Sequence, residues 1–275
     1  MNWFEAVVLG IVQGLTEFLP VSSSGHLVMG QFLAGLRKPE LLFDISVHGG
    51  TLLAVVAVFH RDLLSMAASV ARIPSAMRSE GGLSALLMDR SEVRLLWMIF
   101  LGSLPTALLG LLLAHVAEEL FGTVRLVGAA LLVTGSFLWF TRRRSDAGRP
   151  LREMRWRDAL IIGIAQGLAI IPGISRSGAT IATALYLGLD RELSGRYSFL
   201  LSIPAIIGAL IMAMNGDLFR STLPVGVILA GSFSAAAVGY LALLLLLRIV
   251  KRGQLHHFAP YCWVVGGGAL VMSLV

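Results

Sequence analysis

A short polar run interrupts an apolar stretch near the N-terminus of the chain. Residues 18–30 read FLPVSSSGHLVMG, so three hydroxyls and an imidazole stand where a membrane span would continue. A serine can act as a nucleophile, and a histidine or glutamate can transfer its proton, so these residue types together suit group-transfer chemistry. The candidate residues for that chemistry are Glu17, Ser23 and His26.

A second polar run, PGISRSGATI, spans residues 172–181 and carries a lone arginine. The planar guanidinium group is suited to fork-shaped recognition of phosphate, and the N–H groups at the start of a helix favour anions. We therefore expect a phosphate-binding site in which hydroxyls from both runs take part. Its candidate residues are Arg176, Ser175, Ser177, Ser22 and Ser24.

Gln13 and Glu17 are four residues apart, so they share one helix face. Their oxygen atoms suit a hard cation such as Mg²⁺ or Ca²⁺, held against phosphate oxygens. His48, in FDISVHGGT, is a candidate for lining the same cavity.

A charge at bilayer depth costs about 2.5–3.5 kcal/mol, so the presence of Glu17 and Arg176 needs an explanation. A purely structural ion pair is one alternative explanation. The serines also have a packing interpretation, since small residues let membrane helices approach.

Composition identifies the medium in which these residues lie. Of the 275 residues, 56% are hydrophobic and 14% charged, whereas soluble domains average about 25% charged. The chain also has apolar segments of ~17–25 residues, long enough to cross a ~30 Å hydrocarbon core. These segments are 43–60, 95–117, 123–140, 197–214 and 223–247. The pattern predicts a helical protein embedded in the lipid bilayer, and the single cysteine, Cys262, excludes an internal disulfide.

The basic residues are concentrated in a few loops. The net charge is +6, and seventeen of the 22 Lys and Arg residues lie in 61–94, 142–157, 190–196 and 248–252. An excess of Lys and Arg marks cytoplasmic loops of membrane proteins, so we expect these four segments in the cytoplasm and both termini in the periplasm. The same distribution argues against a nucleic-acid partner.

The chain contains an internal duplication. A shift of 153 positions aligns residues 3–26 with 156–179, with ten identities in 24 positions and no gap. A weaker echo pairs GSLPTALLG at 102–110 with GSFSAAAVG at 231–239. Each aligned motif is an apolar run of ~15 residues that breaks at proline and glycine, which is short for a span and suits a re-entrant hairpin.

Three predicted spans separate the two motifs, and an odd number reverses the second copy in the membrane. The predicted architecture is an all-α polytopic membrane protein, an inverted-topology repeat with two re-entrant helical hairpins and about six transmembrane helices. The boundaries are residues 1–141 for the first repeat with its hairpin at 3–36, 142–157 for a cytoplasmic linker, and 158–275 for the second repeat with its hairpin at 158–189.

The two copies differ at three polar positions. The alignment pairs Glu17 with Ile170, Ser23 with Arg176, and His26 with Ala179. Copy one therefore supplies a carboxylate, a hydroxyl and an imidazole, whereas copy two supplies a guanidinium group. We expect one site built by both motifs, with His26 and Arg176 within reach of one phosphate.

The motifs GIVQGLTEFLPVSSSGHL and PGISRSGATI resemble the two signature motifs of the undecaprenyl-diphosphate phosphatases, also called bacitracin-resistance proteins. The likeness covers the whole chain, including FDISVHGGTLLAVV and RELSGRYSFLLSIP. It implies an enzyme that removes the terminal phosphate of undecaprenyl diphosphate and so recycles the lipid carrier for peptidoglycan. It also implies a divalent metal, and an active site open to the periplasmic side of the bacterial inner membrane.

Carried over by position, the family's (E/Q)-x-x-x-E motif falls on Gln13 and Glu17. Its serine–histidine segment and its arginine motif fall on Ser22, Ser23, Ser24, His26, Ser175, Arg176 and Ser177. Many members have Glu where this chain has Gln13, so less negative charge is present for a metal. The resemblance leaves open whether Ser23 or His26 attacks phosphorus.

A transporter is the main alternative function. Inverted repeats around a midplane site also suit alternating access, and a polyprenyl-phosphate flippase needs an anion clamp but no nucleophile. A structural membrane scaffold would leave the buried Glu and Arg unexplained. The sequence leaves the oligomeric state open, a homodimer included, together with the preferred metal and the lipid chain length.

Overall fold

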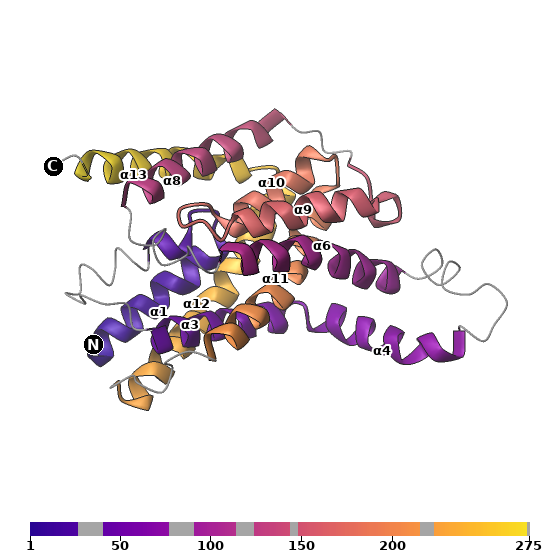
Figure 1. The fold of residues 1–275 in the computed structure, drawn as a ribbon, viewed down its shortest axis with the longest axis horizontal. Coiled ribbons are helices and arrows are strands. Elements are labelled where there is room, and N and C mark those ends of the chain that lie inside the picture. The colour runs from indigo at the N-terminus through magenta and orange to yellow at the C-terminus, as the bar shows by residue number, and fades with distance from the viewer. Residues whose placement is uncertain (27–40, 77–90, 114–123, 144–147, 215–222, 274–275) are drawn as a thin grey trace.

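The computed structural model describes most of the chain, and every regular element in the described part is helical. The described residues are 1–26, 41–76, 91–113, 124–143, 148–214 and 223–273. Most of the helices run roughly along one long axis (Figure 1), and both described ends of the chain lie at the same end of that axis. The helix α4 (His60–Ala76) projects at the opposite end.

The other helices of the described part follow one another along the chain. They are α1 (Trp3–Phe18), α3 (Leu41–Val58), α6 (Ser91–Leu113), α8 (Val124–Trp139), α9 (Trp156–Leu168), α10 (Arg176–Tyr186), α11 (Arg191–Met214), α12 (Val225–Lys251) and α13 (Ala259–Met272). Three short 3₁₀ turns accompany them, η1 (Phe140–Arg143), η2 (Leu151–Glu153) and η4 (Leu255–Phe258).

Four helices in the described residues are long and apolar enough to cross a membrane. They are Ser91–Leu113, Val124–Arg143, Arg191–Met212 and Val225–Lys251, and a bent pair, Leu42–Val58 with His60–Ala71, makes a fifth if it is one broken span. The first four overlap predicted spans, and the protein is an all-α polytopic membrane protein. The predicted span 43–60 ends at a 75° bend that no proline or glycine announces.

The two duplicated motifs begin as short helices. The helices α1 and α9 have 16 and 13 residues, fewer than the ~20 needed to cross the bilayer. Each is followed by a turn with a residue of positive φ, Ser22 at 70° after α1 and Gly173 at 95° after α9. Asn2 caps α1 through a capping box with Glu5. The chain therefore turns after each apolar run, where the proline and glycine residues indicate.

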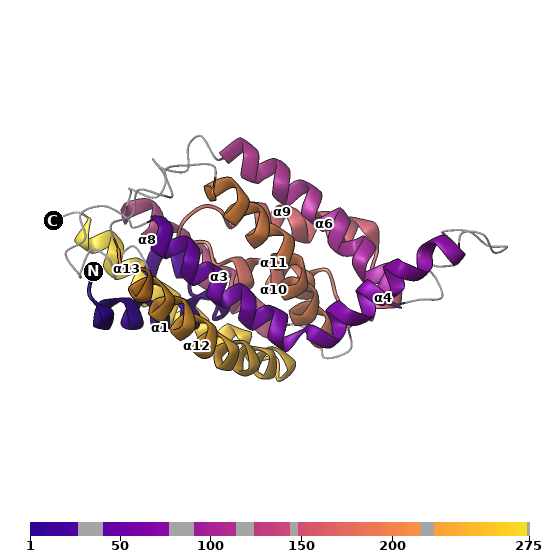
Figure 2. The same cartoon turned by 90° about the horizontal axis from the view of Figure 1, so that it is seen from below.

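The packing of the helices repeats with the sequence. The helix α1 lies beside α12, and α9 lies beside α6 (Figure 2). In the first pair Gly10 lies against the backbone of Gly231, and in the second Gly163 lies against the backbone of Gly102. Gly163 is Gly10 shifted by 153 positions, and Gly102 and Gly231 open the two echoed segments. Each copy therefore packs its hairpin helix on a helix of the other copy through the same glycine contact.

Adding a methyl group at Gly163 is expected to destabilise the protein. A Cβ there would collide with the carbonyl oxygen of Gly102, and backbone cannot move aside as a flexible side chain can. Overpacking of this kind costs about 1–3 kcal/mol, so Gly163→Ala should lower the thermal unfolding midpoint in detergent. Gly208→Ala, in α11, is the matched control because nothing lies within 4 Å of its added Cβ. Equal midpoints for the two variants would contradict this packing.

The segment predicted as a solvated linker is packed against the helices. The guanidinium group of Arg94 donates to the carbonyl oxygens of Leu151 (3.0 Å) and Met154 (2.7 Å). Arg149 pairs with the buried Asp158 at 3.0 Å. The segment is therefore fixed to α6 through its own carbonyl oxygens and to the start of α9 through Arg149. The domain boundaries on either side of it stay a prediction.

Candidate active site

An ion pair joins the two repeats. Glu17 lies in the last turn of α1, and Arg176 is the first residue of α10, directly after its N-cap, Ser175. Arg176 Nη2 donates to Glu17 Oε1 at 2.7 Å. The two residues occupy different positions of the aligned motifs, so neither copy alone could make this pair. The structure thus brings together the two charges that the sequence analysis selected.

The second oxygen of Glu17 accepts from two further polar groups of copy one. Ser23 Oγ donates to Glu17 Oε2 at 2.8 Å, and Gln13 Nε2 donates to the same atom at 3.0 Å. His48 Nε2 lies 3.6 Å from it, beyond normal hydrogen-bond length. We call Gln13, Glu17, Ser23, His48 and Arg176 the carboxylate cluster. His48 therefore lies close to the Glu17 carboxylate, and the cavity that it was expected to line stays a prediction.

The charged centre of the carboxylate cluster is largely buried, yet two polar atoms of the cluster have no partner in the described part of the chain. Gln13 is fully buried, Glu17 is 7% exposed, and the Arg176 side chain is 16% exposed. Gln13 Oε1 and Arg176 Nη1 have no hydrogen-bond partner in the described part of the chain. Buried polar atoms are nearly always hydrogen-bonded, so an orphan acceptor and an orphan donor at one carboxylate indicate that a polar ligand completes the site.

Ser22 bonds the backbone of a turn beside the site and lies in an uncommon backbone conformation itself. Its φ of 70° is uncommon for a residue with a side chain. Its Oγ accepts from the backbone N–H of Gly173 at 3.1 Å and lies 3.3 Å from Ser24 Oγ. Thr134 supports the same turn, since its Oγ1 donates to the carbonyl of Gly173 and accepts from the N–H of Ser175. The described contacts of Ser22 and Ser24 therefore join the turns of the two repeats.

Ser175 and Ser177 lie at the start of α10, close to Arg176. Ser175 Oγ accepts from the N–H of Gly178 at 3.2 Å, which is an N-cap bond, and lies 3.3 Å from Ser177 Oγ. Both serines are almost fully buried. The cap fixes the first turn of α10, from which the Arg176 side chain reaches Glu17. Contact with a phosphate stays a prediction for these two hydroxyls.

His26 faces a different helix. Its Nδ1 lies 2.8 Å from the carbonyl oxygen of Ser22, so Nδ1 carries the proton and donates. Its Nε2 then accepts from the hydroxyl of Tyr261, on α13, at 2.6 Å. The two rings also stack, with centroids 5.7 Å apart. No described hydrogen bond joins His26 to the carboxylate cluster, and its convergence with Arg176 on one phosphate stays a prediction.

Sequence reasoning missed two residues that support the site, Thr134 and Tyr261. Thr134 lies within an apolar span and Tyr261 close to the C-terminus, so neither belongs to a repeated motif. The sequence does carry a signal for Thr134, because a polar residue inside a transmembrane helix usually has a hydrogen-bond partner in the protein. Tyr261 carries no such signal, because tyrosine is common at membrane interfaces.

The residues present fit a cation that takes few protein ligands. No group of three His, Cys, Asp or Glu residues suited to a metal occurs in the described ranges. Mg²⁺ is commonly bound through one or two carboxylates together with substrate phosphates, so three such side chains are not required. The unpartnered Gln13 Oε1, beside the Glu17 carboxylate, supplies oxygen ligands of the right kind.

Comparisons with known proteins agree with one another. The family model described as bacitracin resistance protein BacA matches residues 6–268. A protein of Desulfosudis oleivorans named undecaprenyl-diphosphatase is 52% identical over 277 positions, which cover the whole of both chains. Proteins with the same name from Desulforapulum autotrophicum and Methanosphaera stadtmanae are 47% and 41% identical, and each alignment covers all of this chain and at least 99% of the relative.

Proposed function

The chain belongs to the bacitracin resistance protein BacA family, and we propose that it is a membrane phosphatase that hydrolyses undecaprenyl diphosphate to undecaprenyl phosphate and inorganic phosphate. The observation that carries the proposal is the pair of Glu17 and Arg176, buried between the repeats, with Arg176 Nη1 unpartnered. Recycling of the lipid carrier for cell-wall synthesis, and with it bacitracin resistance, follows from that activity.

Arg176 binds the terminal phosphate in this proposal. Its Nη2 is held by Glu17, which fixes the plane of the guanidinium group and leaves Nη1 for a phosphate oxygen. The start of α10 adds backbone N–H groups and the positive end of the helix dipole. Because the site is largely closed to water, these interactions are stronger than they would be in bulk solvent.

Ser23 is the proposed nucleophile. Its hydroxyl already donates to Glu17 Oε2, which is the arrangement of a nucleophile with its base. Glu17 takes the Ser23 proton as Oγ forms a bond to the terminal phosphorus. The bond from phosphorus to the bridging oxygen breaks, and undecaprenyl phosphate leaves with those electrons. Attack by water on the phosphoserine then releases phosphate and restores the serine hydroxyl.

His26 is the alternative nucleophile, and the described contacts favour it less. Its nucleophilic nitrogen, Nε2, accepts the Tyr261 hydroxyl and would have to release it before attack. His26 lies two residues beyond the Ser22–Ser24 segment, which suits a proton-transfer role near Ser23. We therefore assign His26 to proton transfer and Tyr261 to orienting its ring.

A divalent cation, Mg²⁺ or Ca²⁺, is proposed as the cofactor, held by Glu17 and the unpartnered oxygen of Gln13. When bound, it would neutralise charge on the diphosphate oxygens.

We further propose that the protein lies in the inner membrane with its active site open to the periplasm, since the Arg-rich segments are expected in the cytoplasm. A flippase is disfavoured as an alternative, because transport needs no serine bound to a carboxylate.

Phosphate release by the purified protein tests the proposed function. Undecaprenyl diphosphate in detergent should yield one phosphate per lipid, and a chelator should stop the reaction until Mg²⁺ or Ca²⁺ is restored. Glu17→Gln should lower release strongly, because the amide cannot accept the Ser23 proton, and excess cation should restore only the part of the loss that comes from weaker cation binding. Lipid movement across vesicles without phosphate release would instead establish a transporter.

A further inference from the structure

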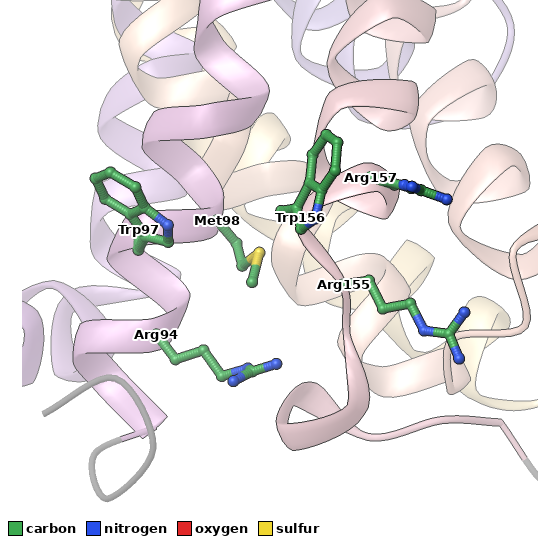
Figure 3. Close-up of a pocket in the computed structure, with 6 residues that line it drawn as sticks. All are labelled: Arg94, Trp97, Met98, Arg155, Trp156 and Arg157. Atoms are coloured by element: carbon green, nitrogen blue, oxygen red, sulfur yellow. The ribbon is translucent and has the colours of Figure 1, made fainter. Parts of the chain in front are cut away.

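A pocket of about 520 Å³ lies where α6 and α9 begin (Figure 3). It is lined by Arg94, Trp97, Met98, Arg155, Trp156 and Arg157. These residues combine three guanidinium groups with two indoles and a thioether. The pocket shares no residue with the carboxylate cluster, and the activity proposed above gives it no role.

The two indoles of this pocket lie at a different depth along the helices from the guanidinium groups of Arg94 and Arg155 (Figure 3). Trp97 follows Arg94 by three residues, which places it about 4.5 Å further along α6. In Figure 3 the two indoles lie above the guanidinium groups of Arg94 and Arg155, further from the end where α6 begins. Trp97 is 40% exposed and Trp156 53% exposed. Tryptophan favours the headgroup level of a bilayer, so Arg94 and Arg155 lie on the aqueous side of that level, and Arg157 lies beside Trp156 at that level (Figure 3).

The pocket carries uncompensated positive charge. Among the described residues, no carboxylate pairs with the guanidinium group of Arg155 or Arg157, although Arg157 lies over the Trp156 ring at 5.2 Å. Asp158, which follows Arg157 in the chain, is occupied by Arg149 and by the backbone N–H of Arg155. An anion that entered the pocket would therefore meet guanidinium groups free to bind it.

Exposed apolar side chains continue from the pocket along both helices. On α6 they include Phe100 and Leu104, and on α9 they include Ile161 and Ile164, each 43–52% exposed. These residues follow the helical spacing of three to four, so each set forms a row on one face. The acyl chains of a lipid bound in the pocket would continue along these rows, whereas a soluble anion has no part that could contact them.

We propose that this pocket binds the phosphate headgroup of an anionic glycerophospholipid from the leaflet in which α6 and α9 begin. The guanidinium groups of Arg155 and Arg157 bind the phosphate, and the indoles contact the glycerol region. The acyl chains lie along the exposed rows of α6 and α9. Basic pockets between membrane helices recognise lipid headgroups by this combination of charge and depth.

Quenching of tryptophan fluorescence by brominated lipids tests the site. The probes are brominated phosphatidylglycerol and brominated phosphatidylcholine, each titrated into bilayers that hold the protein. Quenching should begin at a lower mole fraction of phosphatidylglycerol, and the preference should disappear in a variant with Trp97→Phe and Trp156→Phe. Equal quenching by both lipids would overturn the proposal.

Arginine variants test whether the preference for phosphatidylglycerol depends on this pocket. Arg155→Gln and Arg157→Gln should each weaken the preference about fivefold, since an arginine near the surface contributes that much toward an anionic lipid. Arg152→Gln is the matched control, because Arg152 lies in the same segment but outside the pocket and its side chain is 83% exposed. Arg94 is left intact because it holds two backbone carbonyls.

Two further outcomes would overturn the proposal. The first is an equal loss of preference in the Arg152→Gln control, which would mean a diffuse charge effect. The second is removal of the preference by inorganic phosphate but not by sodium chloride of the same ionic strength, which would mean a site for a soluble anion. Phosphate release from undecaprenyl diphosphate should stay unchanged in the arginine variants, so failure here leaves the proposed function untouched.

Discussion

Ser23→Ala is expected to lower the rate constant of phosphate release on the order of 10⁴-fold, because it removes the nucleophile and leaves only binding and charge stabilisation. Affinity for the lipid should change little, since bond formation to phosphorus belongs to the transition state. Single-turnover phosphate release, measured beside lipid binding in detergent, separates the two quantities.

Ser234→Ala is the matched control for this experiment. Ser234 Oγ donates to the carbonyl oxygen of Ala230 within α12 and makes no described bond to Glu17, so its loss should have a small effect on turnover. If Ser23→Ala kept near-normal turnover while His26→Ala abolished it, the nucleophile would be His26. In that case the bond from Ser23 to Glu17 would be structural.

Arg176→Lys is expected to lower kcat/KM by about 10²–10³-fold, although the charge is kept. The guanidinium group presents nitrogen atoms to Glu17 and to the proposed phosphate at once, whereas a lysine has one nitrogen and cannot reproduce the fixed fork. Arg125→Lys serves as the control, because Arg125 is exposed and donates to the carbonyl oxygen of Ser273 away from the site. The measurement is phosphate release across a substrate titration for both variants.

Near-normal activity in Arg176→Lys would have a specific meaning. The pair with Glu17 would then be a structural ion pair, which was the alternative explanation for two buried charges. A loss of activity accompanied by unfolding would be separated from a catalytic effect by the thermal midpoint of the variant. We expect a folded protein, since lysine can still pair with Glu17.

The sequence predicted the elements of the site better than their contacts. The duplication placed Glu17 and Arg176 in motifs that should meet, and the structure joins them directly. The glycine contacts of α1 and α9 explain why, since each hairpin helix packs on the other copy. The duplication in the sequence was therefore enough to predict that the two motifs meet, because both copies use the same backbone contact.

The direction of individual side chains could not be predicted. Ser22 and Ser23 are adjacent and chemically identical, yet Ser22 bonds the N–H of Gly173 and Ser23 bonds Glu17. The difference depends on the positive φ of Ser22, which no residue type announces. Tyr261 comes from a helix outside the repeated motifs, so only tertiary packing brings it to His26.

The bend between α3 and α4 was also not predictable. Residues 54–64 contain no proline or glycine, so the local sequence favours one continuous helix. The chain nevertheless turns by 75° there. The buried Phe59 stacks on Phe199 at the bend, with ring centroids 6.3 Å apart, which indicates that packing against α11 stabilises this geometry.

The central claim is that residues from both repeats form one phosphatase site, and phosphate release by Glu17→Ala, Arg176→Ala and the double variant tests it most directly. Mutations of groups that act as a unit have non-additive effects on the rate. We expect the purified wild-type protein to release phosphate from undecaprenyl diphosphate. Each single variant, while folded, should lose nearly all of this release. The double variant should be no worse than either single variant. Near-wild-type release by either single variant, or losses that simply multiply in the double variant, would contradict a shared site.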